Sequence, residues 1–238
     1  MSLRSALAAP ESKRQVTRRV FATIADRYDL ITRLLSFGRD RHWKHHLITL
    51  AALGPQDVVL DLASGTGDFA YLALPRVARV VGLDVTHRML VLARSKTPQA
   101  RRVHFVTGDM TALPSPDQTF TVITTGYGLR NVPDLPQAIA EAHRVLKPGG
   151  RFLSLDFNRP AQPVVRAVYL AYLQVVGASL GWLLHRDPDT YRYIPETIRR
   201  YPGAEGVVTL LRAGGFEEAR ALPVLGGLMT IHTARRGA

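Results

Sequence analysis

A glycine-rich turn flanked by acidic residues is the part of this sequence whose residue types imply a ligand. The run Asp61-Leu62-Ala63-Ser64-Gly65-Thr66-Gly67 follows an apolar segment, and Asp84 ends the next one. Gly65 and Gly67 let the backbone approach a ligand closely, and Asp84 can accept both hydroxyl hydrogens of a ribose. The pattern predicts a cradle for a nucleotide-like ligand, although Asp84 could instead cap the following helix with Thr86.

Two kinds of ligand fit this cradle. Enzymes that bind NAD read G-x-G-x-x-G/A at such a turn, Ala70 satisfies the third position, and an acid like Asp84 binds their ribose as well. Asp61 favours S-adenosylmethionine, because an acid four residues before the first glycine can face the ammonium group of that ligand. The methyl donor also has no pyrophosphate that a nearby carboxylate would repel.

A third acid strengthens the interpretation that the ligand is S-adenosylmethionine. Gly108-Asp109-Met110 follows the next apolar segment. Asp109 can accept a hydrogen bond from an adenine amino group and Met110 can pack on the ring, with a plain turn as the alternative. Three acids that end three successive strands resemble the arrangement of class I S-adenosylmethionine-dependent methyltransferases. This resemblance covers about residues 55–160 and implies an α/β, Rossmann-like fold with S-adenosylmethionine as the cofactor.

A longer run at the end of a later strand resembles the signature of one family within that class. Tyr127-Gly128-Leu129-Arg130-Asn131-Val132 is similar to the F-G-L-R-N-V signature of the ubiquinone/menaquinone biosynthesis C-methyltransferases, with Tyr127 replacing phenylalanine. Residues 28–38, 144–151 and 189–198 resemble that family's Y-D-x-M-N-x-x-x-S-F-G segment, its second signature and its S-Y-R-Y-L-x-E-S-I block. The resemblance spans about residues 16–235.

The sequence departs from the family pattern at a few positions. Ile31-Thr32 replace a Met-Asn pair, and Asp40 stands where a histidine is common. Asp156 and Asn158 replace the glutamate and serine that close the second signature. Thr32 and Asp40 lie in the segment expected to face the substrate, so the departures concern substrate contacts rather than the fold.

The resemblance implies transfer of a methyl group to a ring carbon of a prenylated quinol. The sulfonium of the donor is already activated, so no metal is expected. The donor contacts carried over from the motifs are Thr66, Asp84, Asp109, Met110 and Thr125, to which the argument from the glycine turn adds Asp61, Gly65 and Gly67. The sequence does not decide whether the substrate is demethylmenaquinol, a naphthoquinol, or the methoxy-benzoquinol of ubiquinone synthesis. The frequency of menaquinone among bacteria favours the naphthoquinol.

Three residues are candidates for the chemistry on the quinol. Arg130 can stabilise a developing phenolate as a fixed cation, or form a salt bridge with an acid at the sheet edge. Tyr28 can orient the quinol or simply pack the N-terminal helix, and Asp29 can accept the quinol's proton directly or through water. A methyltransferase for another small molecule and a basic binding module that keeps only the fold are the alternatives.

Alternating strands and helices are expected to position these residues. Strands are predicted at 58–62, 79–83, 103–106, 120–125 and 151–156, and helices at 68–74, 86–95 and 136–146. This alternation indicates a mainly parallel sheet flanked by helices. A single domain is expected over 14–238, with N-terminal helices in 14–53 (15–29 and 43–53), a helical substrate cap at 160–202, a helix at 207–213 and a strand at 228–234. Residues 1–13 are expected to be poorly ordered.

The charge of the chain bears on its partners. The 238 residues carry a net charge of +12 and no cysteine, which excludes disulfides, thiolate metal sites and cysteine nucleophiles. The positive field favours an anionic partner such as a membrane surface, or is a general property of the composition. No nucleic acid is expected, because Thr124-Thr125-Gly126-Tyr127 stands where enzymes that methylate its exocyclic amines carry Asn/Asp-Pro-Pro-aromatic.

The stretch Val164–Leu184 is the most apolar part of the chain and is about long enough to span a bilayer. Arg166 and Gln174 interrupt it, so a buried amphipathic helix is favoured, with a groove for an isoprenoid tail as its use. We expect a cytoplasmic protein whose basic surface makes peripheral contact with the inner face of the membrane. The sequence leaves the oligomeric state open.

Overall fold

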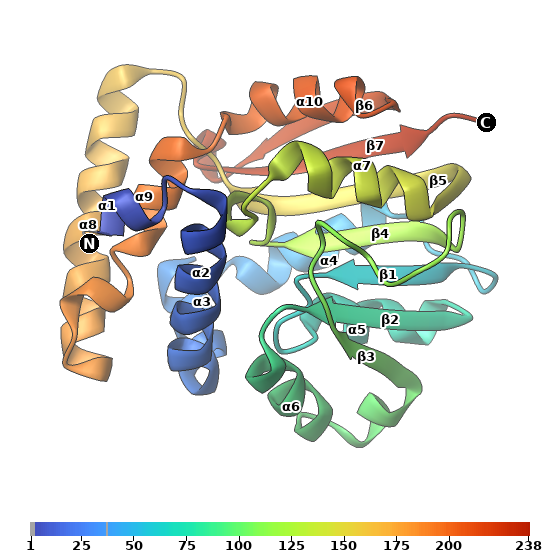
Figure 1. The fold of residues 1–238 in the computed structure, drawn as a ribbon, viewed down its shortest axis with the longest axis horizontal. Helices are drawn as coiled ribbons and strands as arrows, with labels where there is room; N and C mark the ends of the chain where they lie inside the picture. Colours follow the sequence, from blue (N-terminus) through green and yellow to red (C-terminus); the bar gives the residue numbers. More distant parts are fainter. Residues whose placement is uncertain (1–2, 37) are drawn as a thin grey trace.

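The computed structural model describes residues 3–36 and 38–238. It has a seven-stranded sheet with helices on both faces (Figure 1). The strand order is β3-β2-β1-β4-β5-β7-β6. The strands are β1 (Val58–Leu62), β2 (Arg79–Asp84), β3 (Val103–Thr107), β4 (Phe120–Gly126), β5 (Leu146–Phe157), β6 (Phe216–Val224) and β7 (Met229–Arg236). The first five run parallel, and β7 is antiparallel to both β5 and β6, which confirms the predicted mainly parallel sheet.

The strands bury apolar side chains on both faces because consecutive residues point to opposite sides of a sheet. Val59 and Val122 join one apolar cluster, while their neighbours Leu60 and Ile123 join the other. The first cluster packs against α4 (Asp40–Leu50), α5 (Asp68–Ala73) and α6 (His87–Ser95), and the second against α7 (Leu135–Val145) and α10 (Gly203–Ala213). Short 3-10 turns lie at Ala25–Arg27, Leu74–Arg76, Pro98–Arg102, Leu129–Asn131, Pro188–Thr190 and Leu225–Gly227.

The N-terminal segment is more regular than the sequence suggested. Helices α1 (Leu3–Ala6) and α2 (Pro10–Ile24) cover most of the residues for which we expected poor order, while Met1 and Ser2 lie outside the described residues. Pro10 occupies the first turn of α2, where its missing N–H costs no hydrogen bond. Ala6 and Leu7 are buried, and this packing is the physical reason for the difference. The expected helix at 15–29 is divided between α2 and α3 (Tyr28–Leu35).

The region 160–202 is helical as expected, with α8 (Pro163–His185) and α9 (Tyr193–Arg200). The expectation that α8 is buried is wrong, because its buried residues are Tyr169, Leu170, Leu173, Gly177 and Gly181, and most of the rest face solvent. The two glycines let the chain at 187–191 approach closely, since a Cβ on Gly181 would lie 2.4 Å from the Asp187 carbonyl oxygen. Helix α8 is therefore attached along one narrow side.

The helices α2, α3, α8 and α9 stand at the carboxyl ends of the parallel strands (Figure 1). This is the edge at which open α/β sheets bind ligands. The edge strand β6 was not predicted, because Glu217, Glu218 and Pro223 give it the polar, interrupted pattern of a protected sheet edge. A bulge between Glu217 and Arg220 interrupts its pairing with β7.

Candidate active site

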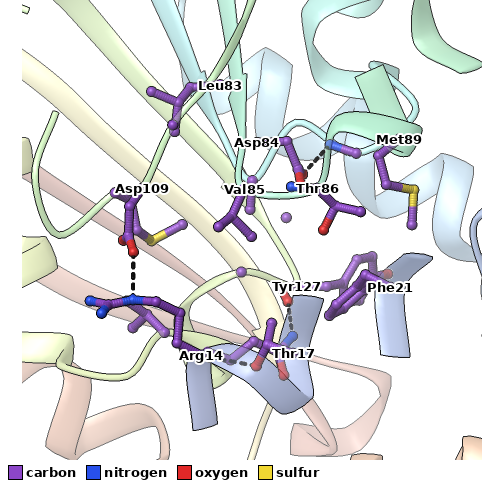
Figure 2. A pocket seen from close by; sticks show the side chains of 18 of the residues that line it. Arg14, Thr17, Phe21, Leu83, Asp84, Val85, Thr86, Met89, Asp109 and Tyr127 are labelled. Carbon is purple, nitrogen blue, oxygen red and sulfur yellow. Dashed lines mark hydrogen bonds and ion pairs between the residues drawn. The ribbon is translucent and has the colours of Figure 1, made fainter. Parts of the chain in front are cut away.

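A cavity lies between the ends of the first strands and helix α2. Its lining includes Gly65 after β1, Asp84 at the end of β2, and Asp109 and Met110 after β3. Arg14, Thr17 and Phe21 project from α2 toward these strand ends (Figure 2). The structure therefore brings four of the predicted donor-binding residues into one space, which we call the first cavity.

The turn after β1 has the backbone conformation that its glycines suggested. Gly65 and Gly67 have φ values of +54° and +85°, in the left-handed region that favours glycine. A Cβ on Gly67 would lie 2.8 Å from the Tyr71 ring, so this position tolerates no side chain. At Gly65 the nearest atoms to such a Cβ are 3.9 Å away, and its backbone is open to the first cavity.

The Asp84 carboxylate both holds this turn and lines the cavity. It accepts hydrogen bonds from the backbone N–H of Gly65 at 2.9 Å and of Thr86 at 2.7 Å. Burial raises the pKa of Asp84, and the two N–H donors partly offset that effect. Asp84 therefore lines the cavity, but it bonds the N–H of the residue before α6 and none in the first turn of that helix, so the capping role considered for it is not seen.

Helix α2 closes the opposite side of the first cavity. The Arg14 Nε atom pairs with Asp109 at 2.9 Å (Figure 2). Lys13 Nζ donates to the Val132 carbonyl oxygen at 2.6 Å, and Thr17 Oγ1 donates to that of Asn131 at 3.3 Å. These contacts were not predicted from the sequence, because nothing in the pattern of α2 shows which loop it faces.

Asp61 does not take the position that we expected. Its side chain is 1% exposed and lies beneath the turn, where it accepts hydrogen bonds from Ser64 Oγ at 2.7 Å and Thr124 Oγ1 at 2.9 Å. Burial raises the pKa of Asp61 to about 7, against the effect of these two bonds. Because neither oxygen faces the first cavity, the structure assigns Asp61 to the support of the turn.

Thr66 and Thr125, the two threonines predicted to contact the donor, do not line the first cavity. Thr66 donates a hydrogen bond to Asp29 Oδ1 at 2.6 Å and lines a small recess beside the turn, together with Lys44 and Asp68. Thr125 is fully buried, and its Oγ1 has no hydrogen-bond partner within the described part of the chain. A Cβ on Gly128 would lie 2.7 Å from that oxygen, so the loop after β4 closes tightly over it.

A second cavity adjoins the first and is lined by aromatic and aliphatic side chains. Tyr28 and Tyr127 line both cavities, and Phe157, Tyr191 and Tyr193 complete the aromatic lining of the second. Two cavities that share part of their lining suit a reaction in which two bound molecules must meet.

Arg130 also faces the second cavity, and it is ion-paired. Its Nη1 lies 2.6 Å from Asp156 Oδ1 and 3.1 Å from the Tyr127 carbonyl oxygen, while its Nε has no partner among the described residues. Burial opposes its charge, but the neighbouring Asp156 outweighs this and raises the pKa of Arg130. The salt bridge considered for Arg130 is therefore present, and the residue also lines the second cavity.

Asp29 lies away from both cavities. Its side chain is half exposed and accepts hydrogen bonds from Thr66 and from Lys96 Nζ, the latter at 2.8 Å. It belongs to an outer, open cavity that also includes Asp40, Lys44 and Asp68. The structure therefore gives no support to Asp29 as the group that takes the quinol's proton.

The fold defines the class of protein. A putative methyltransferase from Bacillus halodurans C-125 is similar with a TM-score of 0.61 and 20% identity, over 82% of this chain and 99% of that one. A S-adenosylmethionine-dependent methyltransferase from Thermotoga maritima, described as a possible histamine N-methyltransferase, gives 0.62 and 20%, over 92% and 99%. The architecture is that of the class I S-adenosylmethionine-dependent methyltransferases.

Residues 9–236 match the ubiE/COQ5 methyltransferase family, and the chain belongs to this family. Demethylmenaquinone methyltransferase of Thermus thermophilus is 40% identical, over 91% of this chain and 100% of the relative. The ubiquinone/menaquinone biosynthesis C-methyltransferase UbiE of Paracoccus denitrificans is 37% identical, over 94% and 92%. The chain is an S-adenosylmethionine-dependent quinone C-methyltransferase, which confirms the predicted family, fold class and methyl donor.

The first cavity fits that donor. The open backbone at Gly65 allows close approach, the carboxylate of Asp84 can accept from hydroxyl groups, and Met110 offers an apolar surface beside Asp109. The bound donor supplies a methyl group on a positively charged sulfur.

Replacing Asp84 tests this assignment. We expect Asp84→Ala to weaken binding of S-adenosylhomocysteine by about 100-fold or more, because two charge-assisted hydrogen bonds are lost. Isothermal titration calorimetry measures the affinity, and circular dichroism checks the fold. The control is Asp117→Ala, which removes an exposed acid paired with Arg144. Tight binding by the Asp84 variant would show that the donor lies elsewhere.

The burial of Asp61 predicts a pH effect on stability. Its folded pKa of about 7 exceeds the ordinary value of about 4, so between these pH values the folded state keeps a proton that the unfolded state has lost. The unfolding free energy should therefore fall as pH rises through this range, by up to about 4 kcal/mol. The Asp61→Asn variant should lack this decrease in unfolding free energy, which urea denaturation at several pH values measures. If the unfolding free energies of the two proteins changed with pH in parallel, the prediction would be wrong.

Proposed function

We propose that the substrate is a prenylated naphthoquinol, demethylmenaquinol, and that the product is menaquinol. The observation that carries this choice is the similarity to the Thermus thermophilus demethylmenaquinone methyltransferase, which this chain matches over that protein's full length. Relatives at 35–38% identity carry both quinones in their names, so they do not favour one ring. The alternative is the methoxy-benzoquinol of ubiquinone biosynthesis.

The second cavity is our candidate for the quinol ring. Tyr28, Tyr127 and Tyr193 offer flat aromatic surfaces on which a ring can pack. Arg130 faces the same space with a charge that does not depend on pH, so it can stabilise negative charge on a quinol oxygen. Tyr28 and Tyr127 line both cavities, so a ring placed there would approach the donor beside these two residues. Transfer requires the reacting atoms to come to about 3 Å.

The remaining donor contacts are part of this proposal. Asp84, Asp109, Met110 and Gly65 line the first cavity and are proposed to contact the donor directly. Gly67 shapes the turn, while Thr66 and Thr125 flank it. Asp109 is held by Arg14, so an adenine amino group would share its carboxylate with that guanidinium or displace it.

An assay with both reduced quinols and labelled donor tests the substrate. We expect the prenylated naphthoquinol to have the higher kcat/KM, by about tenfold, because the second fused ring adds apolar contact with the aromatic lining. Scintillation counting of the extracted quinol measures the transfer under anaerobic conditions. Methylation of the benzoquinol alone would overturn the choice of ring, while methylation of neither would overturn the quinol as substrate.

Helix α8 supports the proposed contact with an anionic membrane. One helix among the described residues, α8, has the length and apolar composition needed to cross a bilayer. It nevertheless packs against the domain through five buried residues. Its exposed face carries Val164, Val168, Val175, Trp182 and Leu183, which are 63–74% exposed. Such a stripe on an otherwise folded domain suits the boundary between headgroups and acyl chains.

Arginines beside this face complement anionic lipid. Arg159, Arg166 and Arg199 line an open groove along α8, together with Leu170. Guanidinium groups bind phosphate oxygens with matching geometry, and each basic residue near an anionic surface contributes about 1 kcal/mol. We propose that α8 lies in the surface of the cytoplasmic leaflet, where a quinol with an isoprenoid tail resides.

Tryptophan fluorescence reports this contact directly. Trp182 is 63% exposed and Trp43 is buried, so a blue shift on adding phosphatidylglycerol vesicles should come from Trp182 and be absent in Trp182→Phe. We expect Val168→Glu/Val175→Glu to weaken vesicle binding by about tenfold or more. Val91→Glu, on α6, is the matched control. Equal binding by the α8 variant, or no shift in the wild type, would contradict the proposal.

A further inference from the structure

Two positions at which this chain departs from the family pattern are in direct contact. The hydroxyl of Tyr127, which replaces the signature phenylalanine, donates a hydrogen bond to Asp40 Oδ1, and Asp40 replaces a common histidine. The two residues are 87 positions apart in the chain. This chain therefore has a hydroxyl and a carboxylate in contact at two positions that differ from the family pattern.

Tyr127 stands between the two cavities and is held firmly. Its backbone N–H donates to the Leu155 carbonyl oxygen at 2.7 Å, and its own carbonyl oxygen accepts from Asn131 Nδ2 at 2.8 Å. Its φ is +58°, a conformation that costs energy for a bulky residue and that clusters at functional sites. The ring therefore has a fixed place beside the space assigned to the quinol.

Asp40 connects this ring to the outer surface. It begins α4 and is mostly buried, and its Oδ2 lies 2.5 Å from Lys44 Nζ. Lys44 Nζ is also 2.7 Å from Asp68 and 5.7 Å from the centre of the Tyr127 ring. Asp40, Lys44 and Asp68 all line the outer cavity, which is open to solvent and also includes Asp29 and Lys96.

We propose that Tyr127 and Asp40 form a relay that removes the proton from the quinol hydroxyl. The inference rests on the proposed quinol substrate, and it holds for either ring. The quinol O–H bond breaks and its proton goes to Tyr127 Oη, while the Tyr127 hydroxyl proton passes to Asp40 Oδ1. The electron pair left on the quinol oxygen increases the electron density at the neighbouring ring carbon, which forms the new bond to the methyl carbon. The methyl–sulfur bond breaks in the same step, and its electron pair stays on the sulfur, which leaves as neutral S-adenosylhomocysteine.

The remaining protons balance through the same groups. The methylated ring carbon loses its hydrogen as a proton to water, and the electrons of that C–H bond restore the aromatic ring with the charge on oxygen. The oxygen then recovers a proton from Tyr127, which takes one back from Asp40. One proton leaves in total, and both residues return to their starting state.

Neighbouring groups fit this task less well. Arg130 keeps its proton and can accept none. Burial, followed by the negative charge of Asp40, raises the pKa of Tyr127 well above its usual value. Tyr127 is therefore unsuited to act as a phenolate base, and it must pass its own proton on as it receives another. Asp29 accepts from Thr66 and Lys96 and is absent from the second cavity.

In this reaction Tyr127 is a catalytic residue, and Asp40 positions it and takes its proton. We expect Tyr127→Phe to lower kcat by about 100-fold, with KM for the quinol and the affinity for S-adenosylhomocysteine unchanged. Asp40→Asn keeps an acceptor for the Tyr127 hydroxyl but removes the proton acceptor, and should lower kcat to the same extent. The double variant should lose no more than either single one, because the two residues act as one unit.

A ring-halogenated quinol separates proton transfer from a purely structural role. Its hydroxyl ionises more readily, so the ratio of wild-type to Tyr127→Phe rates should shrink by about tenfold with this substrate. A structural defect would leave that ratio the same for both substrates. The control is Tyr201→Phe, which removes the hydroxyl of a buried tyrosine that has no hydrogen-bond partner in the described residues.

Two outcomes would overturn the relay. One is a Tyr127→Phe variant with the kcat of the wild type on the quinol that the wild type methylates, and the other is an unchanged rate ratio with the halogenated quinol. Thermal unfolding identifies any variant that fails to fold, and Asp40→Asn then serves as the second test. A wild type that methylates no quinol would instead count against the proposed function, so the two failures are distinguishable.

Discussion

The parallel alignment of strand ends is the constraint on which the site depends. In register, Leu62 of β1 pairs with Leu83 of β2 and with Thr125 of β4, so the loops that follow all leave the sheet at one edge. The hydrogen bond from the Gly65 N–H to Asp84 then joins two of these loops across neighbouring strands. Residues far apart in the chain thereby meet without any element having to bend toward the others. The position of the first cavity therefore follows from the sheet topology.

Patterns that are local in sequence predicted most of this framework. The apolar runs, the glycine turn and the acids at strand ends report on one strand or one turn each, and Asp84, Asp109 and Met110 line one cavity in the structure. Asp61 shows the limit of such reasoning. Like Asp84, it follows an apolar run and was expected to face the ligand, but its partner Thr124 lies on a neighbouring strand. Which acid faces a ligand depends on that register, which the sequence does not state.

Whether a helix is buried was the other feature that the sequence could not predict. Composition alone could not show that α8 has one narrow attached side, because the attachment depends on two glycines that admit the chain at 187–191. The same composition would suit a core helix surrounded by the domain. Likewise, the small, polar and charged residues of 1–13 suggested poor order, although Ala6 and Leu7 are buried in the folded protein. In both cases the deciding partners are distant in the chain.

The charges around Asp40 show why a relay can end there. Asp29, Asp40 and Asp68 are linked by Lys44 and Lys96 through ion pairs of 2.5–2.8 Å, which gives three acids for two lysines. This cluster therefore has one negative charge to spare, and a proton that arrives on Asp40 leaves it neutral rather than positive. A histidine in place of Asp40 would change that balance, and phenylalanine in place of Tyr127 would remove the connection to the cavity. The two departures from the family pattern are thus intelligible together, because a carboxylate at position 40 is useful to a substrate in the second cavity only when a hydroxyl at position 127 connects them.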